Sequence, residues 1–111
     1  MEATEELLRR VAANDESCLR EILSPRRQRD SLCPVTRSLV EISALLAVGA
    51  STASLRWSVE RAVTRGLQDA EVIQVLLSAA STVGVAQTVA SAPRLALALD
   101  VDIEIDGWDG T

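Results

Sequence analysis

The side chains that could do chemistry in this 111-residue chain are carboxylates, thiols, hydroxyls and guanidiniums. The sequence contains no His, Lys or Tyr, and all eleven basic side chains are arginines. These absences exclude histidine general bases, histidine metal ligands, lysine Schiff bases and Ser-His-Asp triads. If the protein is an enzyme, its proton-transfer group must therefore be an Asp, a Glu or a Cys.

One set of candidate residues lies within residues 53–65, where apolar positions at helical spacing predict a helix. Arg56 and Glu60 are four residues apart, with Trp57 and Ser58 between them. In an enzyme, Glu60 would transfer a proton, Arg56 would hold a carboxylate or enolate oxygen, and Trp57 would form an apolar wall. With no catalytic role, Arg56 and Glu60 would form an exposed ion pair worth about 0.3–0.5 kcal/mol, next to an interface tryptophan. The residue types alone leave both interpretations open.

A second pair, Arg37 and Glu41, lies inside a helix predicted at residues 34–48. A carboxylate within an apolar helix can be desolvated, which raises its pKa toward the range useful for acid–base catalysis. The four-residue spacing places both side chains on one face of the helix and favours a structural ion pair instead.

The two cysteines, Cys18 and Cys33, are too few and too far apart for a disulfide scaffold or a Cys-X-X-Cys redox site. Cys33 directly precedes Pro34, where a helix is predicted to begin, and a thiol at a helix N-terminus can have a lowered pKa and react. A helix cap without a chemical role is the favoured interpretation of Cys33, and Cys18 is expected to be inert. Reduced thiols, together with an N-terminus that lacks the apolar run of a signal peptide, indicate a cytoplasmic protein.

The net charge of −5 arises entirely after residue 99. Five acidic residues and no basic residue follow that point, whereas the first 99 residues contain eleven acidic and eleven basic side chains. Because the chain offers no basic face to phosphate and has only two aromatic residues, a nucleic-acid partner is not expected. The cluster of Arg26, Arg27 and Arg29 is interpreted as solvated loop charge rather than as an anion site.

The elements that must position these residues are predicted to be helices. Apolar spacing, caps and breakers indicate six of them, at residues 3–13, 15–23, 34–48, 53–65, 70–82 and 85–99. Polar residues cap helix N-termini and glycine ends helices; the residues expected in these roles are Asp15, Ser51 or Thr52, Asp69, Gly49 and Gly66. Pro93 is expected to interrupt the last helix. Residues 24–31 are interpreted as a loop, and the alternating residues from 100 onward as an extended tail available to pack on a neighbour.

Residues 72–93 contain no charged side chain and are long enough to span a bilayer. Their many Ser, Thr and Gln residues, with one Gly and one Pro, favour buried helices instead, so no membrane partner is expected. The helix predicted at 70–82 is apolar on nearly all sides, and a helix of that kind is normally buried. A chain of this length has little room to bury it alone, so a subunit interface is expected.

Four short motifs occur in a fixed order after residue 31. They are Leu-Cys-Pro-Val-Thr-Arg at Leu32–Arg37, an Ala-x-x-x-Gly helix end at Ala62–Gly66, an acidic helix start at Glu71–Ile73, and Gly84 after a buried helix. In this order and spacing the segment from Leu32 to Leu99, about two thirds of the chain, resembles the carboxymuconolactone decarboxylase family. The resemblance implies an all-α fold of the alkylhydroperoxidase D-like type. It also implies a homo-oligomer, often a trimer or hexamer, with sites near subunit boundaries.

The resemblance implies that the helix at 53–65 bears the catalytic groups, but the family's chemical residues are missing from it. The decarboxylase branch has a His eight residues before the glycine that ends this helix, and here that position is Ser58. The alkylhydroperoxidase branch has Cys-X-X-Cys and a nearby His at the start of the helix, and residues 51–58 contain neither residue type. A peroxidase of that branch needs a thiolate and a resolving thiol close together.

We therefore predict an all-α subunit of about six helices, with N-terminal helices and a loop at 1–31, the family-like domain at 32–99 and an acidic tail at 100–111. It is expected to form a dimer to hexamer of itself, to use no metal or cofactor, and to bind a small molecule or act as an accessory protein. The candidate ligand-binding residues are Trp57, Ser58, Arg37 and Glu41. The alternative is an enzyme acting on a lactone- or enolate-like substrate with Glu60 and Arg56, and an alkylhydroperoxidase-like peroxidase is a distant third.

Overall fold

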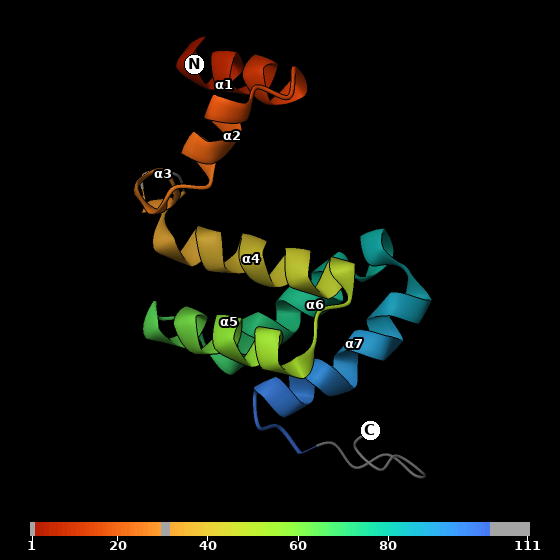
Figure 1. The fold of residues 1–111 in the computed structure, drawn as a ribbon. Helices are drawn as coiled ribbons and strands as arrows, with labels where there is room; N and C mark the ends of the chain where they lie inside the picture. Colours follow the sequence, from red (N-terminus) through yellow and green to blue (C-terminus); the bar gives the residue numbers. More distant parts are fainter. Residues whose placement is uncertain (1, 30–31, 103–111) are drawn as a thin grey trace. The chain divides into compact units, whose positions relative to one another are not determined.

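The computed structural model describes residues 2–29 and 32–102, and within these ranges its secondary structure consists of seven α-helices and no strand (Figure 1). The all-α prediction is thus confirmed for the described residues. The chain divides into two compact units, and the division lies between Leu32 and Cys33. The boundary predicted from the sequence lay one residue earlier, between residues 31 and 32. Most of the predicted tail, residues 103–111, lies outside the described residues.

The first unit contains α1 (Glu2–Ala12), α2 (Glu16–Ile22) and α3 (Pro25–Arg29). Asn14, with φ +58°, ends the first helix, and the Asp15 side chain begins the second by accepting a hydrogen bond from the Cys18 backbone N–H at 3.1 Å. The predicted N-cap at Asp15 is therefore confirmed. Asn and Asp suit this junction because Asn tolerates the left-handed region and Asp satisfies an N–H that has no partner within the helix.

The prediction of a loop at residues 24–31 is wrong for its central part, because α3 occupies Pro25–Arg29. Ser24 begins this helix, since its Oγ accepts a hydrogen bond from the Arg27 N–H at 3.3 Å. Proline is well suited to a first helical position, and Arg and Gln are good helix formers. A segment of five residues without an apolar stripe gives no periodicity, which is why the sequence pattern missed it.

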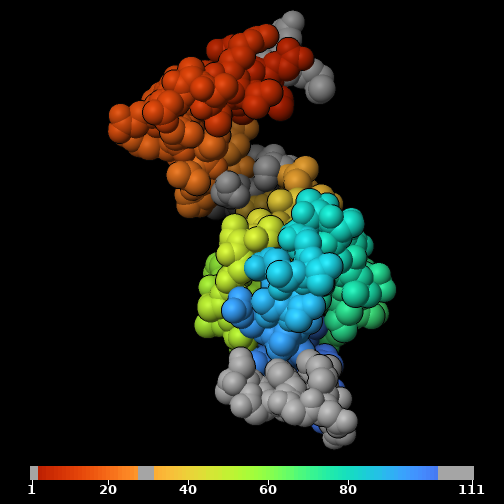
Figure 2. Space-filling model, turned by 90° about the vertical axis from the view of Figure 1, so that its right-hand side faces the viewer, coloured from red at the N-terminus to blue at the C-terminus, as the bar shows by residue number. Residues whose placement is uncertain are grey.

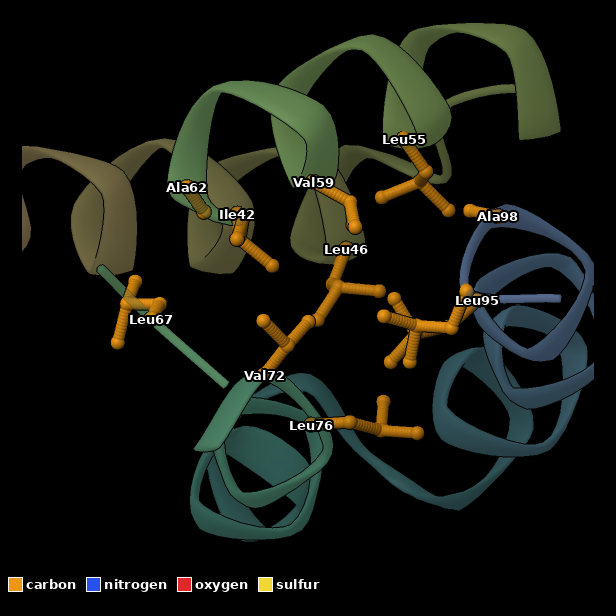
Figure 3. Packing of buried hydrophobic residues seen from close by; sticks show 11 residues of the cluster. Ile42, Leu46, Leu55, Val59, Ala62, Leu67, Val72, Leu76, Leu95 and Ala98 are labelled. Carbon is orange, nitrogen blue, oxygen red and sulfur yellow. The ribbon is translucent and has the colours of Figure 1, made fainter. Parts of the chain in front are cut away.

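The second unit contains four longer helices: α4 (Pro34–Val48), α5 (Thr52–Thr64), α6 (Asp69–Val83) and α7 (Val85–Ala98). Their inward side chains form one core, in which Ile42 and Leu46 of α4 meet residues of the other three helices (Figure 3). The other members of this buried cluster are Leu55, Val59, Ala62, Leu67, Val72, Leu76, Leu95, Ala98 and Leu99. Apolar residues three and four positions apart place a continuous stripe of each helix against this core.

A tight turn between α4 and α5 sets the two helices side by side and antiparallel (Figure 1). Gly49 ends α4 in the left-handed region at φ +73°, and the Ser51 side chain begins α5 by accepting a hydrogen bond from the Ser54 N–H at 3.2 Å. Both ends were predicted and both are confirmed. Because the turn is short, the register between the facing residues of α4 and α5 is fixed.

Two predictions about α6 and α7 need correction. The N-cap of α6 is Gln68 rather than Asp69, and Glu71 Oε1 accepts a hydrogen bond from the Gln68 N–H at 3.0 Å. The break predicted at Pro93 is wrong, because α7 continues through it. Proline removes one hydrogen bond from a helix interior. The buried residues Ser91 and Leu95, one on each side of it, keep both halves of the helix against the core.

Side chains of α7 also complete the C-terminal end of α4. Gln87 Nε2 donates to the Leu46 carbonyl at 2.9 Å, and Arg94 Nη1 donates to the Gly49 carbonyl at 3.3 Å. The Gln87 bond adds to the one that the Leu46 carbonyl accepts from the Gly49 N–H at 3.3 Å, and the Arg94 bond gives a partner to the carbonyl just beyond the helix end. Figure 2 shows α7 (cyan to blue) on one face of this unit, between the α4–α5 turn (yellow-green) and α6 (turquoise-green).

The helix predicted to be buried on nearly all sides is only partly covered in the single chain. Val72 and Leu76 of α6 are buried, whereas 57% of Leu77 is exposed. The prediction that this helix is buried on nearly all sides is therefore not met by the single chain. None of the described helices is long and apolar enough to cross a membrane, which agrees with the interpretation of residues 72–93 as packed helices.

Candidate functional site

A groove of about 720 Å³ lies between α4 and α5 in the second unit. Every residue that lines it belongs to one of these two helices. They are Glu41, Ala44, Leu45 and Val48 from α4, and Ala53, Ser54, Trp57, Ser58 and Arg61 from α5. On each helix these positions are three or four residues apart, so each helix contributes one continuous stripe. The antiparallel arrangement in Figure 1 places the two stripes opposite each other.

The residues near the α4–α5 turn make this part of the groove apolar. Val48 and Ala53 lie closest to the turn, and Ala44, Leu45 and Trp57 continue the walls away from it. Trp57 is 62% exposed, which is a large exposed area for an aromatic side chain. Because the walls are mostly aliphatic or aromatic, a molecule held here would gain mainly from the removal of apolar surface from water.

The other end of the groove is charged. Glu41 of α4 receives three arginines: Arg61 Nη2 donates to Oε1 at 3.1 Å, Arg37 Nη2 lies 3.7 Å from Oε1, and Arg65 Nη1 lies 3.8 Å from Oε2. All four side chains are largely buried, with exposed fractions of 15–31%. Arg65 is also held by the hydroxyl of Ser38, to which it donates at 2.8 Å. Charged groups in such a partly dry environment interact more strongly than on an open surface.

Arg61 joins the charged end of the groove to its apolar wall. Its guanidinium carbon lies 4.5 Å from the centre of the Trp57 ring, within the range of a cation–π contact. Arg61 follows Trp57 by four residues, so both side chains project from the same face of α5. The guanidinium carbon therefore lies over the ring while one of the guanidinium N–H groups donates to Glu41.

Two polar atoms of the groove are buried without a hydrogen-bond partner among the described residues. They are Glu41 Oε2 and Ser58 Oγ, and the Ser58 residue is only 1% exposed. A buried polar atom without a partner costs free energy, and most such atoms in native proteins are satisfied. Because both atoms belong to residues that line one groove, a polar group bound there would remove the cost.

The structure brings three of the sequence-predicted residues together in the groove and places a fourth beside it. Glu41, Trp57 and Ser58 line the groove, and Arg37 contacts Glu41, as the predicted ion pair required. Arg61 and Arg65 were missed as site residues. Their only local signal was spacing, since Arg61 follows Trp57 by four residues and Arg65 follows Arg61 by four, whereas their contact with Glu41 depends on how the chain around α5 pairs with α4.

The two proposed catalytic residues lie elsewhere. Arg56 turns toward α7, where it donates to the Leu97 carbonyl at 2.7 Å and lies 3.6 Å from the Asp100 carboxylate. Glu60 is exposed and is not part of the groove lining. The predicted Arg56–Glu60 ion pair is therefore wrong: within the described part of the chain, the partners of Arg56 are at the end of α7. The four-residue spacing of Arg56 and Glu60 suits an ion pair, but the guanidinium instead binds the partially negative carbonyl groups at the C-terminal end of α7.

The two cysteines have different surroundings. Cys33 is exposed at the N-cap of α4, and its Sγ lies 3.1 Å from Thr36 Oγ1. Hydrogen bonds from the Thr36 side chain and backbone lower the pKa of the Cys33 thiol. Cys18 is buried in the first unit. No cluster of three or more His, Cys, Asp or Glu residues that could hold a metal ion occurs in residues 2–29 and 32–102.

The arrangement as a whole combines apolar and charged groups that could hold a small molecule. The groove offers an apolar wall, one stacked guanidinium, one buried hydroxyl and one carboxylate among arginines, whereas the exposed Glu60 lies outside it. Comparisons with protein-family models, with curated proteins and with solved structures give no match to this chain. The all-α fold and the geometry of the groove therefore carry the functional interpretation.

Proposed function

We propose that this protein binds a small molecule in the groove between α4 and α5. The observation that carries the proposal is the groove itself, which is lined mostly by apolar side chains and includes the buried residue Ser58, whose hydroxyl has no hydrogen-bond partner among the described residues. The volume of about 720 Å³ is within the usual range of ligand sites, roughly 300–1,000 Å³. Binding sites of this kind are mostly apolar, with a few polar groups that fix the orientation of the ligand.

We propose that this binding role does not use the redox or histidine chemistry of the carboxymuconolactone decarboxylase family, which the segment from Leu32 to Leu99 resembles. The alternative enzyme would need Glu60 and Arg56 at one site. Glu60 is exposed outside the groove, and Arg56 is engaged with the end of α7. The observed geometry supports binding over catalysis, because no described carboxylate other than Glu41 lines the groove.

We also propose that the protein is a homo-oligomer. Large apolar side chains remain exposed on several helices of the second unit; those with at least half of their surface exposed are Val40, Val48, Trp57, Leu77, Val85 and Val89. Surfaces of this kind often mark interfaces. Light scattering at micromolar concentration should give the mass of two or more chains, and the mass of one chain would contradict this part of the proposal.

The binding proposal is tested by filling the groove. Ala44 lines it, whereas Ala47 is an exposed alanine on the same helix that does not. Ala44→Trp should abolish binding of the neutral probe N-phenyl-1-naphthylamine, measured by its fluorescence, because the indole would occupy the apolar part of the groove. Ala47→Trp is the matched control and should bind the probe like the unchanged protein. Equal binding by both variants, or no saturable binding by the unchanged protein, would contradict the proposal.

A further inference from the structure

We propose that the ligand of the α4–α5 groove is an apolar monocarboxylate, whose carboxylate is received by Arg61 and Ser58. This inference rests on the proposed function, because it names the chemical class of the molecule that the groove binds. It depends on three properties of the charged end of the groove: the excess of positive charge, the position of Ser58, and the distance to the apolar end.

The charge around Glu41 favours an anion. Two guanidiniums, those of Arg61 on α5 and Arg65 directly after it, contact a single carboxylate, and Arg37 of α4 adds a third contact. One carboxylate cannot neutralise two guanidiniums, so Arg61, Arg65 and Glu41 together carry a net positive charge. A second carboxylate placed here would be attracted in an environment that is largely screened from water.

Arg61 is the guanidinium placed to receive that carboxylate. It lines the groove, whereas Arg65 does not and is already held by the Ser38 hydroxyl. Among the described residues, the one hydrogen bond of the Arg61 side chain goes to Glu41, and its guanidinium carbon lies over the Trp57 ring. An arginine has five N–H donors in a planar fork that matches a carboxylate, so donors remain for a second acceptor.

Ser58 supplies the second donor. It precedes Arg61 by three residues on α5, so the two side chains project from one face, and both line the groove. Its hydroxyl has no partner among residues 2–29 and 32–102, and a hydroxyl can donate one hydrogen bond. A carboxylate oxygen bound next to Arg61 would satisfy it, whereas a purely apolar ligand would leave it buried and unpaired.

The register of the two helices sets the size of the apolar part. Glu41 and Arg61 meet at one end, and the Gly49–Ser51 turn closes the other end next to Val48 and Ala53. From Glu41 to Val48 the helix rises about 10 Å, at 1.5 Å per residue. A fused aromatic ring system or an alkyl chain of similar length would lie along Trp57 with its carboxylate at Arg61.

The test compares an acid with its neutral isostere, 1-naphthaleneacetate with 1-naphthaleneacetamide. Titration calorimetry gives the affinities, and the indole N–H signal of Trp57 in NMR spectra, assigned with a Trp108→Phe variant, reports binding in the groove. The acid should bind about tenfold or more tightly than the amide, because a charge-assisted hydrogen bond is stronger than a neutral one. Ala44→Trp should abolish binding of both compounds.

Substitutions then assign the preference to its donors. Arg61→Gln should reduce the preference for the acid to about twofold or less, because the charge-assisted contact is lost. Arg20→Gln removes the same charge from an exposed site in the first unit and should leave the preference unchanged. Ser58→Ala should lower the affinity for the acid several-fold. It should not lower the melting temperature of the ligand-free protein, since it removes an unpaired buried hydroxyl.

The outcomes separate this inference from the proposed function. If the amide binds the groove as tightly as the acid, the carboxylate assignment is overturned and small-molecule binding stands. If the acid preference survives Arg61→Gln, the assignment to Arg61 is overturned. If neither compound shifts the Trp57 signal, or if Ala44→Trp leaves both affinities unchanged, the groove is not the site and both proposals fail.

Discussion

Different kinds of interaction stabilise the interior of each of the two units of this chain. In the first unit, Cys18 is the only buried residue among those whose burial is described, and six ion pairs join exposed or half-exposed side chains of residues 5–27. In the second unit, eleven buried side chains from four helices, from the loop before α6 and from Leu99 directly after α7 form one apolar cluster (Figure 3). The first unit is rich in charge contacts and the second is rich in apolar contacts.

This difference indicates which unit contributes most of the stability of the protein. Burial of a large apolar side chain stabilises by about 1.5–3 kcal/mol, whereas an exposed ion pair contributes about 0–1 kcal/mol. A unit of some thirty residues without an apolar core rarely folds alone. We therefore expect the second unit to unfold cooperatively and the first to open at much lower free energy, which native-state hydrogen exchange would measure.

The largest effect should come from the core of the second unit. Leu46→Ala removes a side chain that is 1% exposed and should destabilise the protein by about 2–5 kcal/mol, measured by urea unfolding followed by circular dichroism. Val48→Ala, two residues later on α4 and 77% exposed, should change the stability by about 0.5 kcal/mol or less. Equal effects at the two positions would contradict the placement of the core.

A smaller effect is expected at the turn that sets the register of the groove. Gly49→Ala places a side chain in the left-handed region, which costs about 1–2 kcal/mol, and its Cβ would lie 2.9 Å from Gln87 Nε2. Gly66→Ala is the control, because its φ is also positive, at +102°, but nothing lies within 4 Å of the new Cβ. If Gly49→Ala is no more destabilising than Gly66→Ala, the contact with Gln87 has no energetic role.

The sequence predicted the second unit well because its signals are local. The proline that begins α4, the glycine that ends it and the serine that begins α5 each act on their own neighbours, and all three lie where expected. The predictions failed for two different reasons. Pro93 lies inside α7 because buried residues on both sides hold the helix together, so packing overrode a local preference. In the first unit, α3 forms from local capping and helix propensity but lacks the apolar pattern by which a helix is recognised.

The candidate site could be predicted only in part, for a related reason. Residue types and spacing pointed to Glu41, Trp57 and Ser58, each of which lines the groove. The contacts of Glu41 with Arg61 and Arg65 join residues twenty or more positions apart, and they depend on the register between α4 and α5. The glycine and serine of the turn were predicted, but the pairing of individual residues across the two helices was not. The local Arg56–Glu60 spacing predicted a pair that the tertiary structure does not form.

The pH dependence of the first unit should sharpen the comparison. Hydrogen bonds from the Cys18 backbone N–H, the Ser17 hydroxyl and Arg10 lower the pKa of Asp15 from 3.8 to about 2. Because the folded pKa is below the unfolded value, this stabilisation is fully present above pH 3.8 and is lost as the pH falls toward 2. NMR shifts of α2 residues should therefore titrate near pH 2. Asp15→Ala should abolish that titration and loosen α2, whereas a midpoint near pH 4 would mean that the cap is not formed.

The smallest effect is expected at the exposed ion pairs of the first unit. Arg9 lies 3.2 Å from Glu6 and 3.8 Å from Glu5, but its side chain is 70% exposed. Ordering a long side chain offsets most of the attraction, and salt screens the remainder. Arg9→Ala should therefore change the free energy of opening of α1, measured by hydrogen exchange, by about 0.5 kcal/mol or less. The difference should shrink further at high salt. A loss well above 1 kcal/mol that disappears at high salt would break the comparison, because charge contacts would then hold the first unit together as the apolar cluster holds the second.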